Sequence, residues 1–217
     1  MGIRQFAAVF LGVVLLSMMV PAPSRAAVIW DESTHGDLSN LQGTPTKLAL
    51  ALGTNSIKGS VVGTTDVRDW VTLTVPAGRQ LKQIILAAYT STDAQGFTGF
   101  DAATTFAGDT FDPASYTGYS HYGTGATNPT IPTNLIGVDI LPIMADPTAA
   151  AGSKGFATPL GPGDYAFLIQ QLGASTAYQF DYVVVPEPST VMLMGLGCAA
   201  LVAVVRRRVR RQGIVRS

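Results

Sequence analysis

Residues 164–185 read DYAFLIQQLGASTAYQFDYVVV, and this stretch decides the fold class. Aromatic and β-branched residues recur at alternate positions in 165–169 and again in 178–183, a pattern typical of strands with one buried face. Residues 172–175 read LGAS and have the composition of a turn. We therefore predict two strands here and expect them to pair as an antiparallel hairpin.

The same pattern extends through most of the chain ahead of this stretch. Short apolar or alternating runs, each bounded by Gly, Pro, Asn or Asp, predict about seven strands, at 47–52, 56–62, 70–75, 81–89, 135–141, 164–171 and 177–185. No window here keeps a 3.6-residue period between caps, so we expect only short helices. Repeated short strands separated by turns predict an all-β fold, with a single β-sandwich or jelly-roll-like domain.

Residues 91–134 depart from this regularity. They are dense in Gly, Thr, Ser, Asp and aromatic residues, as in GFTGF at 96–100 and SYTGYSHYG at 115–123. A structureless loop of this length is uncommon in a compact domain, so the segment is either a functional excursion or contains a strand or two that the pattern does not place. Its aromatic side chains could form a platform for sugar rings or a protein partner, or could pack the loop onto its own sheet.

The C-terminal stretch 185–211 reads VPEPSTVMLMGLGCAALVAVVRRRVRR and combines three features. Pro186 and Pro188 flank Glu187 and end any preceding strand, because proline fixes φ and lacks a backbone donor. Residues 189–205 carry no charge, and as a helix they would be roughly 26 Å long, near the lower limit for spanning a bilayer. By the positive-inside rule, the arginines that follow would hold this end in the cytoplasm: Arg206, Arg207, Arg208, Arg210 and Arg211.

In this order and spacing, the three features resemble the PEP-CTERM protein-sorting signal of Gram-negative bacteria, over about 27 residues. The resemblance implies that an exosortase, a membrane-embedded cysteine transpeptidase, recognises Pro186, Glu187 and Pro188 and cuts near them. The protein would then pass to the cell surface or the extracellular matrix, and the motif would belong to a substrate, not to a catalyst. Hydropathy alone leaves a second interpretation open, an ordinary single-span anchor that is not cleaved.

The N-terminus has the organisation of a signal peptide. Arg4 forms a short basic region, an apolar run follows at 6–20, and small residues precede the expected cleavage site. We expect signal peptidase to cleave between Ala26 and Ala27, with an uncleaved anchor as the alternative. The chain then consists of a signal peptide at 1–26, a β-sandwich domain at 27–185 and a sorting signal at 186–211, which comprises the motif at 186–188, a transmembrane helix at 189–205 and the arginine cluster at 206–211.

The exported body, residues 27–185, is acidic although the whole chain has a formal net charge of zero. It contains thirteen acidic and six basic residues, a net charge of −7. Such a body argues against nucleic acid or anionic lipid as a partner, since phosphate binding needs clustered Lys and Arg. Divalent cations and neutral glycans stay open as partners. The only cysteine, Cys198, lies in the apolar tail, so no disulfide stabilises the body.

Oxygen-bearing side chains gather in sequence near the start of the body. Asp66 and Asp69 flank a turn further on. No stretch has the spacing of an EF-hand loop, so calcium is one interpretation and ordinary solvated turn and cap residues are the other. If calcium binds, with its roughly six to eight oxygen ligands, the predicted ligands are Asp31, Glu32, Asp37 and Asn40.

The body also resembles the bacterial pre-peptidase C-terminal type of β-sandwich. The matching segments are GDLSN at 36–40, LALGTN at 50–55, DWVTLTVPAG at 69–78, GPGDYAF at 161–167 and YQF at 178–180. This resemblance implies a non-catalytic accessory or surface module that is sometimes dependent on calcium, and it does not imply proteolysis. The long segment at 91–134 departs from the pattern of that family.

The body lacks the usual signatures of an enzyme. Its only histidines are His35 and His121, and it holds no cysteine, which excludes a Cys-His pair and an HExxH zinc helix. Nucleophile elbow, P-loop and dinucleotide fingerprint are all missing from the sequence. A two-carboxylate glycosidase has no fixed motif, but Glu32 is the only glutamate of the body. For any activity that is found, Glu32 and His121 are the best candidates.

We therefore predict a bacterial protein that is exported, held for a time in the inner membrane and processed by an exosortase. Its predicted role is structural or adhesive, at the cell surface or in an extracellular polysaccharide matrix such as that of a biofilm. The alternative is a membrane-tethered module that binds carbohydrate or calcium and keeps its anchor. In neither case do we expect catalysis.

Overall fold

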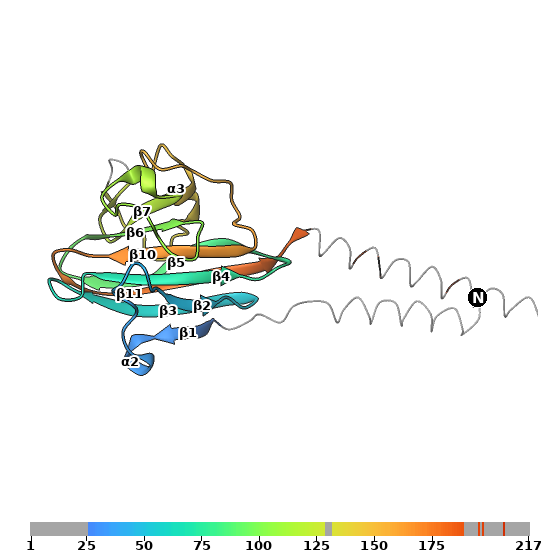
Figure 1. Cartoon of the computed structure of the whole chain (residues 1–217), viewed down its shortest axis with the longest axis horizontal. Helices are drawn as coiled ribbons and strands as arrows, with labels where there is room; N and C mark the ends of the chain where they lie inside the picture. The colour runs from blue at the N-terminus through green and yellow to red at the C-terminus, as the bar shows by residue number, and fades with distance from the viewer. Residues whose placement is uncertain (1–25, 129–131, 189–194, 196, 198–205, 207–217) are drawn as a thin grey trace, which may run out of the picture. The chain divides into compact units, whose positions relative to one another are not determined.

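The computed structural model describes residues 26–128, 132–188, 195, 197 and 206. The chain divides into two units, and Arg25–Pro186 contains all the strands of the described residues. These strands form two sheets and a short ribbon, which agrees with the predicted all-β sandwich (Figure 1). Apart from positions 195 and 197, the expected transmembrane helix at 189–205 lies outside the described residues. Among the residues that are described, no helix is long and apolar enough to cross a membrane.

Sheet A has four strands in the order β1-β3-β11-β5, and sheet B has five in the order β2-β4-β10-β6-β7. Sheet A consists of β1 (Ala27–Asp31), β3 (Gly53–Val62), β5 (Arg79–Ser91) and β11 (Ser175–Pro186). Sheet B consists of β2 (Thr46–Ala49), β4 (Arg68–Val75), β6 (Gln95–Asp101), β7 (Gly118–Gly123) and β10 (Gly163–Gln170). The ribbon pairs β8 (Ala126–Thr127) with β9 (Pro132–Thr133), and the short helices are α2 (Glu32–His35), η1 (Pro113–Ser115) and α3 (Leu141–Ala145).

The main hydrophobic core lies between the two sheets. Alternate residues of the central strands point into it, as the period of a strand requires. On β4 these are Val71, Leu73 and Val75, and on β11 they are Tyr178, Phe180, Tyr182 and Val184. The pairing is antiparallel except at two outer positions, where β1 runs parallel to β3 and β2 parallel to β4.

The predicted hairpin between the two aromatic runs is wrong. β10 pairs with β4 and β6 in sheet B, whereas β11 pairs with β3 and β5 in sheet A. The residues between them cross from one sheet to the other, and the rings of Phe167 and Tyr182 meet across the core at 5.8 Å. Alternation shows that a strand has one buried face, but it does not distinguish a neighbour in the same sheet from a partner in the opposite sheet.

Besides the short strands β8 and β9 of the ribbon, the described part of the segment 91–134 contains two strands, β6 and β7, which pair at the edge of sheet B. The residues between them, 102–117, return over the outer face of that sheet and build a second hydrophobic cluster there. The ring of Tyr116 lies directly over Gly99, where any side chain would overlap with it. We call this group the outer cluster: Trp70, Phe106, Tyr116, Ala166 and Leu168.

The strand predicted at 135–141 is also wrong, because this segment forms only isolated bridges to β5. Gly137 has a φ of +80°, a left-handed conformation that breaks an extended run. The Asp139 carboxylate accepts hydrogen bonds from the Ile84 N–H at 3.0 Å and the Leu141 N–H at 3.1 Å. The segment leads into α3, from which Leu141 and Met144 enter the main core.

Candidate functional site

Four carboxylates gather where the N-terminal segment meets β3 and β4. Glu32, Asp37 and Asp69 each place one carboxylate oxygen within 4.8 Å of an oxygen from each of the other two. Asp66 lies in the turn between β3 and β4, and its negative charge acts on Asp69. Glu32, Asp37, Asp66 and Asp69 are called the acidic cluster below.

The N-terminal segment fixes Glu32 in this cluster. Asp31 caps α2, and Gly36, with a φ of +85°, turns the chain directly after the helix. The Oε1 atom of Glu32 accepts a hydrogen bond from the Leu38 N–H at 3.1 Å, and Oε2 accepts one from the Ser60 N–H at 2.6 Å. Glu32 therefore joins the N-terminal segment to β3, and its carboxylate is held in one orientation.

Asp69 is the most buried member of the cluster, with 0 % of its surface exposed. It is in phase with the inward-facing residues of β4, so its side chain points between the sheets. Oδ2 accepts a hydrogen bond from the Tyr178 hydroxyl at 2.6 Å, whereas the buried Oδ1 has no partner among the described residues. The Tyr178 ring passes over Gly59 to reach Asp69. Only glycine leaves room for it, because a Cβ atom at position 59 would overlap with the Tyr178 hydroxyl. The Oδ1 atom of Asp66 is also buried and has no hydrogen-bond partner among the described residues.

Burial shifts the pKa values of this cluster upward. The pKa of Asp69 is raised to about 8, chiefly because burial penalises the charged carboxylate. The hydrogen bond from Tyr178 lowers this pKa, while the negative charges of the other three members raise it. Burial also raises the pKa of Glu32 and that of Asp66.

No protein cation offsets these charges within the described part of the chain. The two salt bridges found there are Lys58–Asp31 and Lys154–Asp101, and neither includes a member of the acidic cluster. The buried Asp69 carboxylate is costly to charge without a counter-ion, because the charge loses its hydration and gains only one hydrogen bond.

The donor set fits a divalent cation that prefers oxygen ligands, such as calcium. Glu32, Asp37 and Asp69 would hold the ion. Asp66 is not one of these three ligands, but its negative charge acts on Asp69. A bound cation would give the orphaned Oδ1 of Asp69 a partner and would offset the negative charge of the cluster. The buried, unpaired Oδ1 of Asp69 is the structural observation that supports this fit, since buried carboxylate oxygens are normally paired.

The structure brings together only part of the predicted ligand set. Glu32 and Asp37 belong to the cluster, and the Asn40 amide donates a hydrogen bond to Asp37 Oδ2 at 3.2 Å. Asp31 lies outside the group. It accepts a hydrogen bond from the Ser33 hydroxyl, and this bond is the main interaction that lowers the pKa of Asp31. Its Oδ2 atom lies 3.5 Å from Lys58 Nζ.

Asp69 could have been found from the sequence by its phase. It precedes Val71, Leu73 and Val75 at steps of two, which places an acidic residue on the buried face of an alternating strand. An acidic residue in that phase is expected to have a partner or a ligand.

The other singled-out residues are exposed or lie apart from the cluster. β1 begins at Ala27, directly after the expected cleavage site, and both Ala26 and Ala27 are exposed. Pro186 is the last residue of β11 and is exposed, Glu187 is half-buried and Pro188 is exposed. Of the five arginines, Arg206 is described and exposed, and Arg207, Arg208, Arg210 and Arg211 lie outside the described residues.

The two candidates for a hydrolytic activity belong to different elements. Glu32 opens α2 and belongs to the acidic cluster, whereas His121 lies on β7 of sheet B and is not a member of it. The structure does not bring them together as an acid-base pair in the cluster.

Comparison with known proteins adds three findings. A search of curated proteins finds no match. Among solved structures, the chain is similar to the pre-peptidase C-terminal domain of collagenase from Bacillus anthracis, with 14 % sequence identity and a TM-score of 0.32 over 68 % of this chain and 100 % of that chain. The family model for the PEP-CTERM protein-sorting motif matches residues 184–211. The chain therefore carries a PEP-CTERM sorting motif and is an exported protein of the kind that an exosortase processes.

Proposed function

We propose that this protein is a non-catalytic component of the cell surface or extracellular matrix, with a structural or adhesive role. The observation that carries the proposal is the position of the sorting motif, which begins inside the last strand of the sandwich. β11 extends to Pro186, and the motif matches from residue 184. The sorted cargo is thus the sandwich itself.

Its maturation would follow from the order of the segments. Signal peptidase cuts between Ala26 and Ala27, and the apolar segment 189–205 holds the protein in the inner membrane. Exosortase then cuts near 186–188. β11 pairs with both β3 and β5, so the last strand belongs to the folded body and a cut beyond Pro186 leaves the sandwich whole.

The intact mass and location of the mature protein in its native host test this proposal. We expect a species truncated near 186–188 at the surface or in the medium, and accumulation of the uncut form in the inner membrane when the exosortase is deleted. A full-length tail in both strains would instead favour the uncleaved membrane-tethered module.

We further propose that the acidic cluster binds calcium and that the ion stabilises the exported sandwich. Glu32 and Asp37 come from the N-terminal segment, whereas Asp69 comes from β4. An ion bound to all three would connect that segment to the sandwich. Because an ion that binds only the folded state stabilises it, a concentration of 100 times Kd would add about 2.7 kcal/mol to the free energy of unfolding.

Thermal unfolding of the purified protein, with calcium and with chelator, tests the calcium proposal. We expect calcium to raise the midpoint by several degrees. Asp37→Asn should abolish the increase, whereas Asp31→Asn should keep it, because Asp31 contacts Lys58 and Ser33 instead of the cluster. A midpoint that is identical in calcium and chelator would exclude a stabilising ion, and magnesium in place of calcium tests which ion the cluster prefers.

A further inference from the structure

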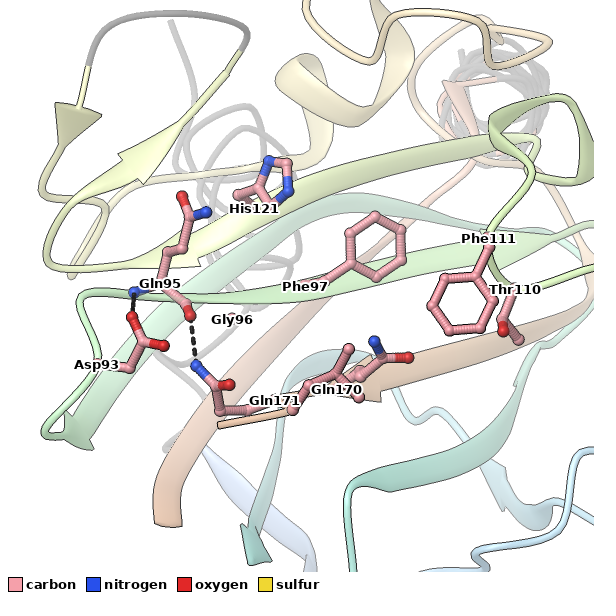
Figure 2. A pocket seen from close by; sticks show the side chains of 10 residues that line it. Asp93, Gln95, Gly96, Phe97, Thr110, Phe111, His121, Gln170 and Gln171 are labelled. Carbon is pink, nitrogen blue, oxygen red and sulfur yellow. Dashed lines mark hydrogen bonds between the residues drawn. The ribbon is translucent and has the colours of Figure 1, made fainter. Parts of the chain in front are cut away.

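A row of four side chains crosses the outer face of sheet B. Gln170 of β10 pairs with Arg68 of β4 on one side and with Phe97 of β6 on the other, and Phe97 pairs with His121 of β7. Cross-strand partners point to the same face of a sheet, so the four residues form one strip, called the outer row below. Gln170, Phe97 and His121 also line a groove of about 400 Å³ (Figure 2).

The neighbouring row of side chains on the same strands is covered by other residues, whereas the outer row is not. The covered row consists of Trp70, Leu168, Gly99 and Tyr119, and the rings of Phe106 and Tyr116 from the outer cluster pack on it. At the outer row, Phe111 is the residue from 102–117 that stacks on Arg68, with the guanidinium carbon 5.6 Å from the ring centre. Its side chain nevertheless remains 72 % exposed.

Phe111 and Phe97 give the groove two apolar ring surfaces, contributed by a loop and by the sheet. Phe111 is the most exposed large hydrophobic residue of the described chain. Exposure of one ring alone is ordinary, but a concave site of this size lined by aromatic rings and a few polar groups has the usual form of a ligand-binding site.

Polar atoms without partners line the same groove. Gln170 Oε1 accepts a hydrogen bond from Arg68 Nε at 3.0 Å, which leaves the amide NH₂ group unpaired within the described residues. His121 Nδ1 donates to the Thr127 carbonyl at 2.8 Å, so Nε2 of the neutral ring is an acceptor, and it too has no partner in the described part of the chain. Figure 2 shows the Gln170 amide between the rings of Phe97 and Phe111.

We propose that this groove binds a neutral polysaccharide. Pyranose rings would stack on Phe97 and Phe111, and their hydroxyl groups would bond to the Gln170 amide and to His121 Nε2. A pyranose presents a face of C–H groups and a rim of hydroxyls that both donate and accept, which matches this lining of aromatic faces and unpaired polar atoms. The inference rests on the adhesive role proposed above and gives it a ligand class.

The charges around the groove favour a neutral ligand. Asp93 is the only acidic residue that lines it, and none of the lining residues is Lys or Arg. The adjacent Arg68 already contacts Gln170 and Phe111. With a net charge of −7, the exported body would repel an anionic polymer.

The edge of the sheet argues against an extended peptide as the ligand. Peptides commonly bind by adding a strand to a free edge, and β7, which carries His121 of the groove, is one of the two edge strands of sheet B. At His121 that edge is closed, because its N–H donates to Asn128 Oδ1 at 2.9 Å and its carbonyl accepts from Asn128 Nδ2 at 3.1 Å.

Calorimetric titration of the full-length protein in mild detergent tests the proposal, with cellohexaose, maltohexaose and mannohexaose as probes. We expect at least one of them to bind and Phe111→Ala to weaken that binding about tenfold or more. Leu52→Ala, which truncates an exposed apolar residue that does not line the groove, should leave the affinity unchanged. Because Phe111 is mostly exposed, the Phe111→Ala variant should keep the thermal midpoint of the parent.

Asp93→Asn distinguishes a neutral ligand from a cationic one. Asparagine retains the Oδ1 acceptor that holds the Gln95 N–H, so only the charge is lost. For a neutral glycan, we expect the affinity to stay within about twofold, since little Coulombic attraction is lost. A much larger loss would indicate a cationic ligand and overturn the proposal.

Two further results would also overturn it. One is the absence of millimolar or tighter binding to all three glycans, or equal affinity in the parent and Phe111→Ala. The other is binding of gelatin, an extended polypeptide, that depends on Phe111 while the glycans do not bind, since this would assign the groove to a protein partner. Sorting by the exosortase is measured separately, from the mass of the mature C-terminus. The sorting proposal and the glycan-binding proposal can therefore fail independently.

Discussion

Tyr178 of sheet A donates a hydrogen bond to Asp69 of sheet B at 2.6 Å, and this contact joins the two layers through a buried carboxylate. Both residues are buried, with 3 % and 0 % of their surface exposed. The second oxygen of Asp69 is unpaired among the described residues, so the tyrosine satisfies only half of the carboxylate. The acidic cluster therefore extends from the exposed Asp37 into the core, where Asp69 lies.

Removing this hydroxyl should destabilise the metal-free protein. In Tyr178→Phe, Asp69 Oδ2 loses its donor, and a buried polar group without a partner costs about 1–3 kcal/mol. The pKa of Asp69 should rise further, because the hydrogen bond from Tyr178 lowers it. Chemical denaturation in chelator measures the change.

Tyr122→Phe is the matched control. The Tyr122 hydroxyl is buried and has no hydrogen-bond partner within the described residues, so its removal should be neutral or stabilising. Equal loss of stability in the two variants would show that the hydrogen bond from Tyr178 to Asp69 does not stabilise the fold.

Gly59 should be needed for the shape of the site. In Gly59→Ala the new methyl group would overlap with the Tyr178 hydroxyl and would come within 3.1 Å of Glu32 Oε1. We expect lower stability, by about 1–3 kcal/mol, and weaker calcium binding, because both neighbours must move. Gly43→Ala, where no atom lies within 4 Å of the added carbon, should change neither property.

The stability of the metal-free protein should fall as pH rises from about 4 to about 8. The pKa of Asp69 is raised from 3.8 to about 8 on folding, so in this window the folded state binds more protons than the unfolded state, and deprotonation favours unfolding. The full stability is present below the unfolded pKa, and the loss is complete above the folded pKa. One such group contributes a slope of at most about 1.4 kcal/mol per pH unit.

Denaturation curves at several pH values in chelator, for the parent and for Asp69→Asn, measure this slope. The difference between the two proteins isolates Asp69 from Glu32 and Asp66, whose pKa values are raised in the same direction. Stability that rises through the window in the parent and not in the variant would contradict the assignment. Calcium should oppose the loss, because the ion binds the deprotonated carboxylates.

The strands of this fold could be predicted from the sequence more easily than their partners. Alternation identified the strands around Tyr165 and Tyr178, because each buries one face. It did not assign them to opposite sheets, because pairing depends on contacts between distant segments, such as β10 with β4 and β6. β6 escaped the pattern because Gly96 and Gly99 stand where an alternating strand would carry side chains, and tyrosine rings occupy that space.

The acidic cluster could be predicted only in part for a similar reason. Glu32 and Asp37 are close in sequence and were found, whereas Asp69 reaches them through the fold of β4. Asp31 shows the reverse, since it is adjacent to Glu32 in sequence but contacts Lys58 and Ser33. Neighbouring residues at the start of a helix point in different directions, so proximity in sequence did not identify a common site.

The outer cluster should hold the 102–117 segment on sheet B. Phe106 is 2 % exposed and packs on Trp70 at a ring distance of 5.4 Å, so Phe106→Ala should cost about 3–5 kcal/mol, the usual range for a buried aromatic residue. Because that contact fixes the segment rather than the main core, we expect faster proteolysis within 102–117 before global unfolding.

Phe111→Ala, in the same segment but 72 % exposed, should leave both the stability and the cleavage rate near those of the parent. Cleavage sites read by mass spectrometry decide the question: cuts spread over the whole chain in Phe106→Ala would mean that the outer cluster stabilises the sandwich as one unit with its core.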